Sequence, residues 1–382
     1  MATKIERIEL SVFETESNTG RFDLVEVEVK PGRIRWKRQG RGQPRDEIHV
    51  LHVITSDGIQ GDCTVGDARY TTMRRDDLEQ LRILAIGEDA LDRERLIRKM
   101  HAATRGMFTL QGWYGTFDNC LWDIAGKLEG KGVRELLGQA RASCPAYYNL
   151  GGATKEAAAE DACVAVERGF PAVKDHFGGD AAENIDWFRG VRAAVGDKVD
   201  VLHDAAGCDY TLEEAITVGK ELDELHFGWF EEPLPDRDQE GLQELCATVE
   251  VPILAPETMM NDFELSALWL RLGAVDMLRV NARAGMTHIR QLAQIAEEMD
   301  TTIEANGPGG LFGLIHAHLV CGIGNTTYYE YFPDGSRDAA GQLIGLLNPP
   351  VPVSGQITTP AGPGWGAEWD WTRFKRARVA LL

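Results

Sequence analysis

The sequence lacks the features that would tie the protein to a nucleic acid or to a membrane. Acidic residues outnumber basic ones by 60 to 40, and the formal net charge of -20 argues against nucleic-acid binding as the main role. No apolar run reaches the length of about 18 residues that a membrane span needs. The N-terminus has no apolar stretch before a small-residue cleavage site. We therefore expect a cytoplasmic protein without a membrane segment.

Several kinds of site are also missing from the sequence. The seven cysteines are scattered without a CxxC pair, which is typical of reduced, buried thiols and not of a disulfide framework or a zinc site. No GxGxxG, P-loop, GxSxG or HExxH pattern is present, so the usual signatures of nucleotide sites, serine hydrolases and zinc proteases are absent. Any chemistry must come from another arrangement of side chains.

The chain is long enough for two domains, with 382 residues of which 43% are hydrophobic. Residues 1–140 mix strand-like and helix-like patterns and predict an α+β domain, which we expect the tail, residues 355–382, to complete. Residues 141–354 alternate short apolar strands with helical stretches. The strands are predicted at 145–149, 172–176, 199–204, 227–232, 252–257, 275–281, 301–306 and 327–331. Eight such repeats predict a (β/α)₈ barrel, and a doubly wound sheet, the alternative, would rarely need so many.

Two short patterns indicate where helices begin. Thr211–Glu214 and Asn261–Glu264 resemble capping boxes, so helices are expected to begin just after the third and fifth barrel strands.

Residues 31–45 read as a loop after a possible strand at 22–30. This segment is strongly basic and has no acidic residue, so it is either a solvated or oligomer-contacting loop or a lid that attracts anions. Its basic residues, with the one that precedes it, are Lys30, Arg33, Arg35, Lys37, Arg38, Arg41 and Arg45.

Three acidic residues each end an apolar run: Asp204 in VDVLHDAAG, Glu231 in GWFEEPLP and Glu257 in PILAPET. The gaps from 204 to 231 and from 231 to 257 are 27 and 26 residues, which fits one strand, one helix and two loops. Taken singly, each acid could simply cap a helix or start a loop. Together, at the ends of successive parallel strands, the carboxylates converge and repel one another unless a cation lies between them. An all-oxygen site of this kind suits Mg²⁺.

A candidate acid–base pair lies on the second barrel strand. In AVKDH, side chains alternate in direction, so Lys174 and His176 point the same way, beside the strand that bears Asp204. Imidazole has the intrinsic pKa that suits a general base near neutrality. Across the barrel, Glu330 ends the eighth strand. The alternatives are an ion pair of Lys174 with Asp204 and a purely structural hydrogen bond of His176.

Four other polar residues lie at or near the ends of barrel strands. Glu232 alternates away from Glu231 and is a candidate for contact with a substrate, whereas His203 points away from the barrel centre and is expected to be structural. Asn281 and Asn306 end the sixth and seventh strands. Each is either a substrate-binding amide or a remnant without a role.

The chain resembles the enolase superfamily, and in particular its mandelate-racemase-like subgroup. The resemblance covers nearly the whole chain and is carried by DNCLWDIAGKLEGKGVRELLG, the K-x-H of strand two, HDAAG, WFEEPLP, APET, YYEYF and PGWGAEWD. It implies a TIM-like barrel with a capping domain from the N-terminal region and the C-terminal tail, an essential Mg²⁺, and abstraction of the proton α to a carboxylate. By this resemblance Asp204, Glu231 and Glu257 are the metal ligands, and Glu330 hydrogen-bonds the substrate carboxylate.

The sequence departs from that subgroup at the acid–base positions. The subgroup commonly has K-x-K on strand two, where this chain has His176 in second place. It also commonly has an Asp–His dyad on strands six and seven, where this chain has Asn281 and then Asn306 or a neighbouring glycine. Racemisation needs a base on each face of the substrate, so these losses argue against a racemase.

A one-base elimination of water remains open. We therefore predict a Mg²⁺-dependent hydro-lyase that dehydrates an acid sugar, an aldonate or aldarate, to a 2-keto-3-deoxy acid. The alternatives are a cycloisomerase or epimerase with an unrecognised second acid, and a metal-binding homologue without turnover. The expected partner is a small carboxylate substrate, and we expect a homo-oligomer.

Overall fold

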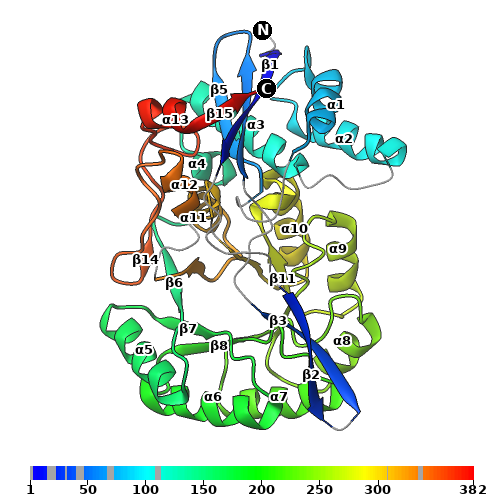
Figure 1. Cartoon of the computed structure of the whole chain (residues 1–382), viewed down its shortest axis with the longest axis vertical. Coiled ribbons are helices and arrows are strands. Elements are labelled where there is room, and N and C mark those ends of the chain that lie inside the picture. Colours follow the sequence, from blue (N-terminus) through cyan, green and yellow to red (C-terminus); the bar gives the residue numbers. More distant parts are fainter. Residues whose placement is uncertain are drawn as a thin grey trace.

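The computed structural model describes residues 3–14, 23–30, 32–39, 47–66, 73–107, 113–307, 309–333 and 339–382. Two regions stack along the long axis of the molecule, a strand-rich cap that holds both chain ends and a barrel below it (Figure 1). No helix in these ranges is long and apolar enough to span a bilayer. The boundaries at residues 140 and 355 stay a prediction, but the two regions they were meant to separate are both present.

The cap is built on an antiparallel sheet whose order is β15-β1-β4-β5. Its strands are β1 (Ile5–Glu14), β4 (Glu47–Thr55), β5 (Gln60–Thr64) and, from the C-terminus, β15 (Arg378–Leu381). Because β15 pairs with β1, the expected return of the tail to the N-terminal region is confirmed. Four helices accompany the sheet: α1 (Arg75–Ala85), α2 (Arg93–Met107), α3 (Tyr114–Glu129) and α4 (Val133–Leu137).

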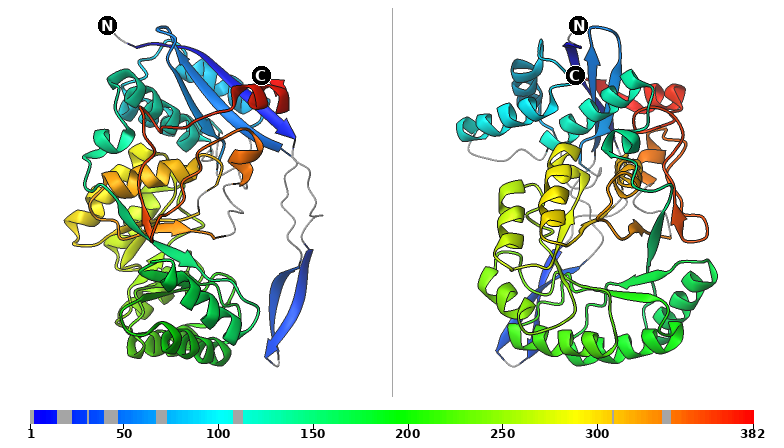
Figure 2. Two further views of the ribbon diagram at one scale, coloured as in Figure 1. Left: turned by 90° about the vertical axis from the view of Figure 1, so that its left-hand side faces the viewer. Right: turned by 180° about the vertical axis from the view of Figure 1, so that it is seen from behind.

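The barrel consists of eight parallel strands that pair in the order β12-β11-β10-β9-β8-β7-β6-β13. They are β6 (Cys144–Asn149), β7 (Ala172–Asp175), β8 (Asp200–Asp204), β9 (Phe230–Glu231), β10 (Ile253–Ala255), β11 (Met277–Val280), β12 (Ile303–Ala305) and β13 (Tyr329–Tyr331). The helices between them are α5 (Lys155–Glu167), α6 (Ala181–Val195), α7 (Leu212–Glu224), α8 (Gln239–Cys246), α9 (Phe263–Arg271), α10 (Met286–Glu298) and α11 (Phe312–Gly322). Each predicted strand is present, which confirms the barrel (Figure 2).

The described ranges also contain four short elements, in addition to the sheet strands and the helices named above. They are the 3₁₀ turn η1 (Ala282–Ala284), α12 (Ala339–Leu343), β14 (Gln356–Ile357), which pairs with β6, and α13 (Trp371–Ala377). A buried cluster contributed by the strands and their flanks fills the barrel and forms a floor for the polar residues at the carboxyl ends of the strands. Its members are Tyr147, Ala172, Leu202, Trp229, Leu254 and Tyr328.

Helix α3 of the cap fastens to the barrel at η1 and the start of α10. The Asp118 carboxylate accepts hydrogen bonds from the backbone N–H of Thr287 at 2.7 Å and from its hydroxyl at 2.6 Å. The Asn119 amide donates to the Ala282 carbonyl at 2.9 Å. A Cβ atom at Gly115 would lie 2.0 Å from the carbonyl oxygen of Arg283, so only glycine permits this approach. The cap therefore fixes the backbone that follows β11.

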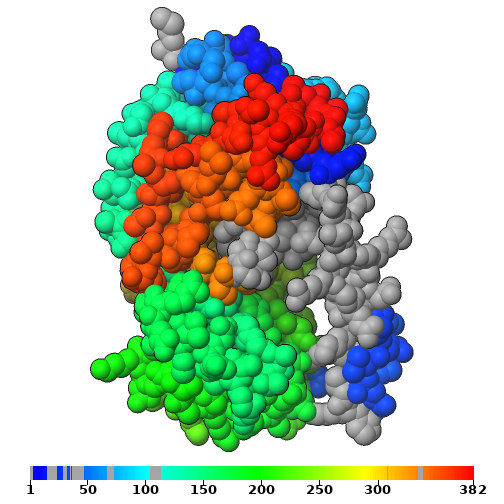
Figure 3. All heavy atoms as spheres, turned by 60° about the vertical axis from the view of Figure 1, so that its left-hand side comes forward, coloured from blue at the N-terminus to red at the C-terminus, as the bar shows by residue number. Residues whose placement is uncertain are grey.

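A hairpin stands beside the barrel, where the sequence predicted a loop. Strand β2 (Asp23–Lys30) pairs antiparallel with β3 (Arg33–Gln39), so the loop prediction for residues 31–45 is wrong for β3. The alternation of Ile34 and Trp36 with basic residues was the missed strand signal. Arg33 ties the hairpin to the barrel through Glu214 at 2.5 Å. Figure 3 shows the blue atoms of this hairpin next to the green barrel. Residues 41 and 45 lie outside the described ranges.

Candidate active site

The buried ammonium of Lys174 lies at the centre of the polar cluster. Its Nζ atom is 3.0 Å from Asp204 Oδ2, 3.0 Å from Glu231 Oε2 and 3.0 Å from Glu330 Oε1. Burial alone would lower the pKa of Lys174, but the surrounding carboxylates hold it well above its ordinary value. In this arrangement Lys174 is a fixed cation and a poor proton acceptor.

His176 lies at the edge of the cluster, just beyond the end of β7. Its Nε2 atom is 3.1 Å from Asp204 Oδ2, and its side chain is 35% exposed, compared with 1% for Lys174. The alternation along β7 thus brings both residues to Asp204, and the imidazole is the more exposed of the two.

The opposite face of the same two strands is fastened by a buried pair. His203 Nδ1 lies 2.7 Å from Asp175 Oδ1, and the two residues are register partners on β8 and β7. Burial alone would lower the pKa of His203, but Asp175 raises it to about 10. His203 therefore lies away from the carboxylate cluster, and the pair locks the strands that carry Lys174 and Asp204.

The structure groups Asp204, Glu231 and Glu232, each offering a carboxylate oxygen, with these atoms within 4.8 Å of one another. Burial raises the pKa of Glu231 to about 7, and burial with the charge of Glu257 raises that of Glu232 to about 10. Raised pKa values of this kind are what crowded carboxylates show when a cation is needed to balance them. The all-oxygen donor set fits Mg²⁺.

The third predicted ligand, Glu257, lies two residues beyond β10 and next to this group. Its Oε2 atom accepts a hydrogen bond from the Asn306 amide. Glu232 occupies the nearer position because β9 ends at Glu231 and the backbone turns to a φ of 47° at Glu232. The prediction that Glu232 points away from Glu231 relied on strand alternation, which does not apply beyond the end of the strand.

Amide side chains occupy the far side of the site. Asn281 donates to the carbonyl and side-chain oxygens of Asn306 at 2.7 and 2.8 Å. The backbone N–H of Gly307 donates to Glu330. An amide cannot accept a proton usefully near neutral pH, so positions 281 and 306 supply no base.

Two buried residues of the site escaped the sequence analysis. Arg279 is fully buried, with Nη2 2.7 Å from Glu231 Oε1 and 3.1 Å from the Tyr147 hydroxyl. The Asn149 amide donates to Glu330 Oε1 at 3.3 Å. Arg279 stands two positions before Asn281 on β11, and Asn149 two after Tyr147 on β6, so strand alternation could have found both. Arg279 is a second cation beneath the acidic cluster.

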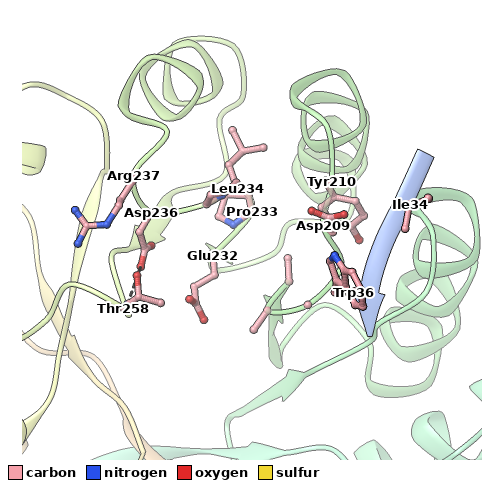
Figure 4. Close-up of a pocket in the computed structure, with 14 residues that line it drawn as sticks. Ile34, Trp36, Asp209, Tyr210, Glu232, Pro233, Leu234, Asp236, Arg237 and Thr258 are labelled. Carbon is pink, nitrogen blue, oxygen red and sulfur yellow. Dashed lines mark hydrogen bonds between the residues drawn. The ribbon is translucent and has the colours of Figure 1, made fainter. Parts of the chain in front are cut away.

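An open cavity of about 680 Å³ lies over this cluster, between the hairpin and the loops after β8, β9 and β10. Ile34 and Trp36 form its outer wall, and Tyr210 lies beside them (Figure 4). The carboxylate of Glu232 points into the space, and Asp236 bonds to Thr258 on the other side. A small molecule that enters here meets the carboxylate of Glu232, one member of the acidic group.

Comparisons with known proteins agree with this architecture. Residues 157–373 match the family model described as enolase C-terminal domain-like. The chain is 26% identical over 365 residues to a D-galactonate dehydratase family member of Catenulispora acidiphila, covering 86% of this chain and 83% of that protein. It is 28% identical over 302 residues to arabinonate dehydratase of Saccharolobus solfataricus, covering 74% and 79%. D-glucarate dehydratase from Agrobacterium tumefaciens, solved with magnesium, superposes with a TM-score of 0.81 at 26% identity, over 100% of both chains.

Proposed function

Because the chain belongs to the enolase C-terminal domain-like family and is a carbon–oxygen lyase of the enolase superfamily, we propose that it dehydrates an acid sugar to a 2-keto-3-deoxy acid. The relatives' names as dehydratases support the reaction class. The observation that carries the proposal is that, within the described part of the chain, His176 is the exposed acid–base group beside the buried carboxylates. Aldonates and aldarates are the substrates this site would take.

The metal in this proposal is Mg²⁺, held by Asp204, Glu231 and Glu257. Glu232 stands close enough to share in the site. When bound, the ion would stabilise the negative charge that develops on the substrate carboxylate as the α-proton leaves. Lys174 and Arg279 balance part of the remaining acidic charge from below.

The chain's own residues then account for the proton transfers. His176 accepts the α-proton at Nδ1, while its Nε2–H donates to Asp204 Oδ2, 3.1 Å away, which holds the imidazole in place. The imidazolium returns that proton to the β-hydroxyl, the C–O bond breaks, and water leaves. The enol that remains becomes the 2-keto acid by ordinary tautomerisation. Lys174, kept protonated by its neighbours, binds the substrate carboxylate, and Glu330 positions the ammonium at 3.0 Å.

Because both transfers use His176, the elimination is syn. Among the residues that the structure describes, positions 281 and 306 face the substrate from the other side with amides. A racemase or epimerase would need a base there. A binding protein without turnover would have no use for a buried ammonium held by three carboxylates next to an exposed imidazole. A cytoplasmic location and a homo-oligomer stay predictions.

A library of acid sugars tests the function directly. Aldonates and aldarates of five and six carbons are incubated with the purified protein and Mg²⁺, and 2-keto-3-deoxy products are measured. We expect at least one acid to be dehydrated, activity to vanish with a chelator, and Mg²⁺ to restore it. Turnover that persists in chelator, or a lactone as the only product, would contradict the proposal.

A further inference from the structure

A second cavity adjoins the far side of the site and contains an arginine. It measures about 240 Å³ and is lined by Glu257, Thr258, Met260, Asn261 and Arg283. Thr258 also lines the larger cavity over the acidic cluster, so the two spaces meet at this residue. The cavity that contains Arg283 is therefore a neighbour of the larger one, and the proposed metal ligand Glu257 lines it.

The guanidinium of Arg283 is held in place by the amides of the far side. The Asn281 side-chain oxygen accepts hydrogen bonds from the backbone N–H of Arg283 at 2.9 Å and from its Nε at 3.2 Å. Asn281 is itself fixed by its two bonds to Asn306. Behind it, Gly115 of α3 packs against the Arg283 carbonyl. The backbone of Arg283 is thus held by Asn281 and Gly115, and its guanidinium is oriented by the bond from Nε to Asn281.

We propose that Arg283 forms an anion subsite for the distal carboxylate of the substrate, which makes the substrate a sugar diacid, an aldarate. This inference rests on the proposed dehydration. A guanidinium offers five donors in a planar fork that matches a carboxylate. Glu257 serves as a metal ligand in the proposed function, and Arg283 is the basic residue among those that line this cavity. The first carboxylate then lies at Lys174, and the second at Arg283.

Arg237 is the competing candidate and supplies a matched control. It lies at the rim of the larger cavity and is exposed, with its guanidinium turned away from Glu232 (Figure 4). The structure gives it none of the side-chain anchoring that holds Arg283. If charge near the entrance were enough to select a diacid, Arg237 would serve as well as Arg283.

The experiment compares matched acids on four proteins. Galactarate with galactonate and glucarate with gluconate are assayed on the wild type, Arg283→Gln, Arg283→Lys and Arg237→Gln. We expect the wild type to favour a diacid over its monoacid. Arg283→Gln should raise KM for that diacid roughly tenfold to hundredfold with a smaller change in kcat, as loss of charge-assisted hydrogen bonds predicts. Arg283→Lys should recover part of the loss, and Arg237→Gln should keep the wild-type preference.

Three outcomes would overturn the inference. They are a wild-type preference for the monoacid, an equal rise of KM for both acids in Arg283→Gln, and a diacid-specific loss in Arg237→Gln. Thermal unfolding of each variant shows whether it is folded. Recovery of activity in Arg283→Lys, which keeps the positive charge, separates a local effect on binding from misfolding. Turnover of neither class would refute the proposed dehydration itself, and the inference with it.

Discussion

Replacing His176 by asparagine should abolish exchange of the substrate α-proton with solvent and lower kcat by about 10²–10⁴-fold, the usual contribution of a general base. Asparagine keeps a polar side chain next to Asp204 but cannot accept a proton. Lys174 cannot take over, because its carboxylate neighbours hold its pKa well above the ordinary value. Mg²⁺ affinity should stay close to that of the wild type.

The measurement is deuterium uptake at the α-carbon, with Mg²⁺ binding followed by calorimetry on the same sample. His226→Asn is a suitable control, since His226 is exposed and lies between α7 and β9, at the other end of the barrel. Its φ of 53° suits asparagine. Normal exchange in His176→Asn would contradict the assignment of His176 as the base and would also put the exclusion of Lys174 in question.

Replacing Glu257 by glutamine should weaken Mg²⁺ binding by about a hundredfold, because it removes a full ligand charge from a hard-cation site. Glu232→Gln should weaken it far less. Glu232 lies outside the proposed ligand set, and burial and the neighbouring carboxylates raise its pKa to about 10 when no cation balances them. The two variants together decide which acid completes the site with Asp204 and Glu231.

Calorimetric titration with Mg²⁺ at constant ionic strength gives both affinities. Unchanged binding in Glu257→Gln, or a larger loss in Glu232→Gln, would make Glu232 the third ligand. That result would agree with the 4.8 Å grouping of Asp204, Glu231 and Glu232 and would limit Glu257 to its bond with Asn306.

The barrel could be predicted from the sequence because its strands are short, apolar and evenly spaced. Strands buried on both faces need such runs, and the helices between them bring the carboxyl ends to one side. The sequence signals for helix starts predicted the capping residue correctly for one of two helices. Thr211 caps α7 with Glu214 as predicted, whereas Asp262, and not Asn261, caps α9. A one-residue ambiguity of this kind is decided by the backbone angles, which the sequence pattern leaves open.

The site was less predictable where contacts cross the barrel. Alternation gave the directions of Lys174 and Asp204, whose side chains meet at 3.0 Å. It could not give the turn at Glu232, which depends on where β9 ends. The contact of Arg279 with Glu231 reaches across β10, from β11 to β9, and needs the three-dimensional arrangement of these strands, although the direction of Arg279 on β11 could be read from Asn281. The roles of these residues as ligands and bases stay predictions.

The central claim is that one base works on one face of the substrate, and stereochemistry in D₂O tests it most directly. An acid of a single α-configuration, identified in the acid-sugar library, is carried to partial conversion with Mg²⁺, and the recovered substrate is analysed. The account predicts that any deuterium at the α-carbon appears with retained configuration, because His176 both removes and returns the proton. Appearance of the opposite α-epimer would contradict it, since that product requires a second acid on the face where the structure has Asn281 and Asn306.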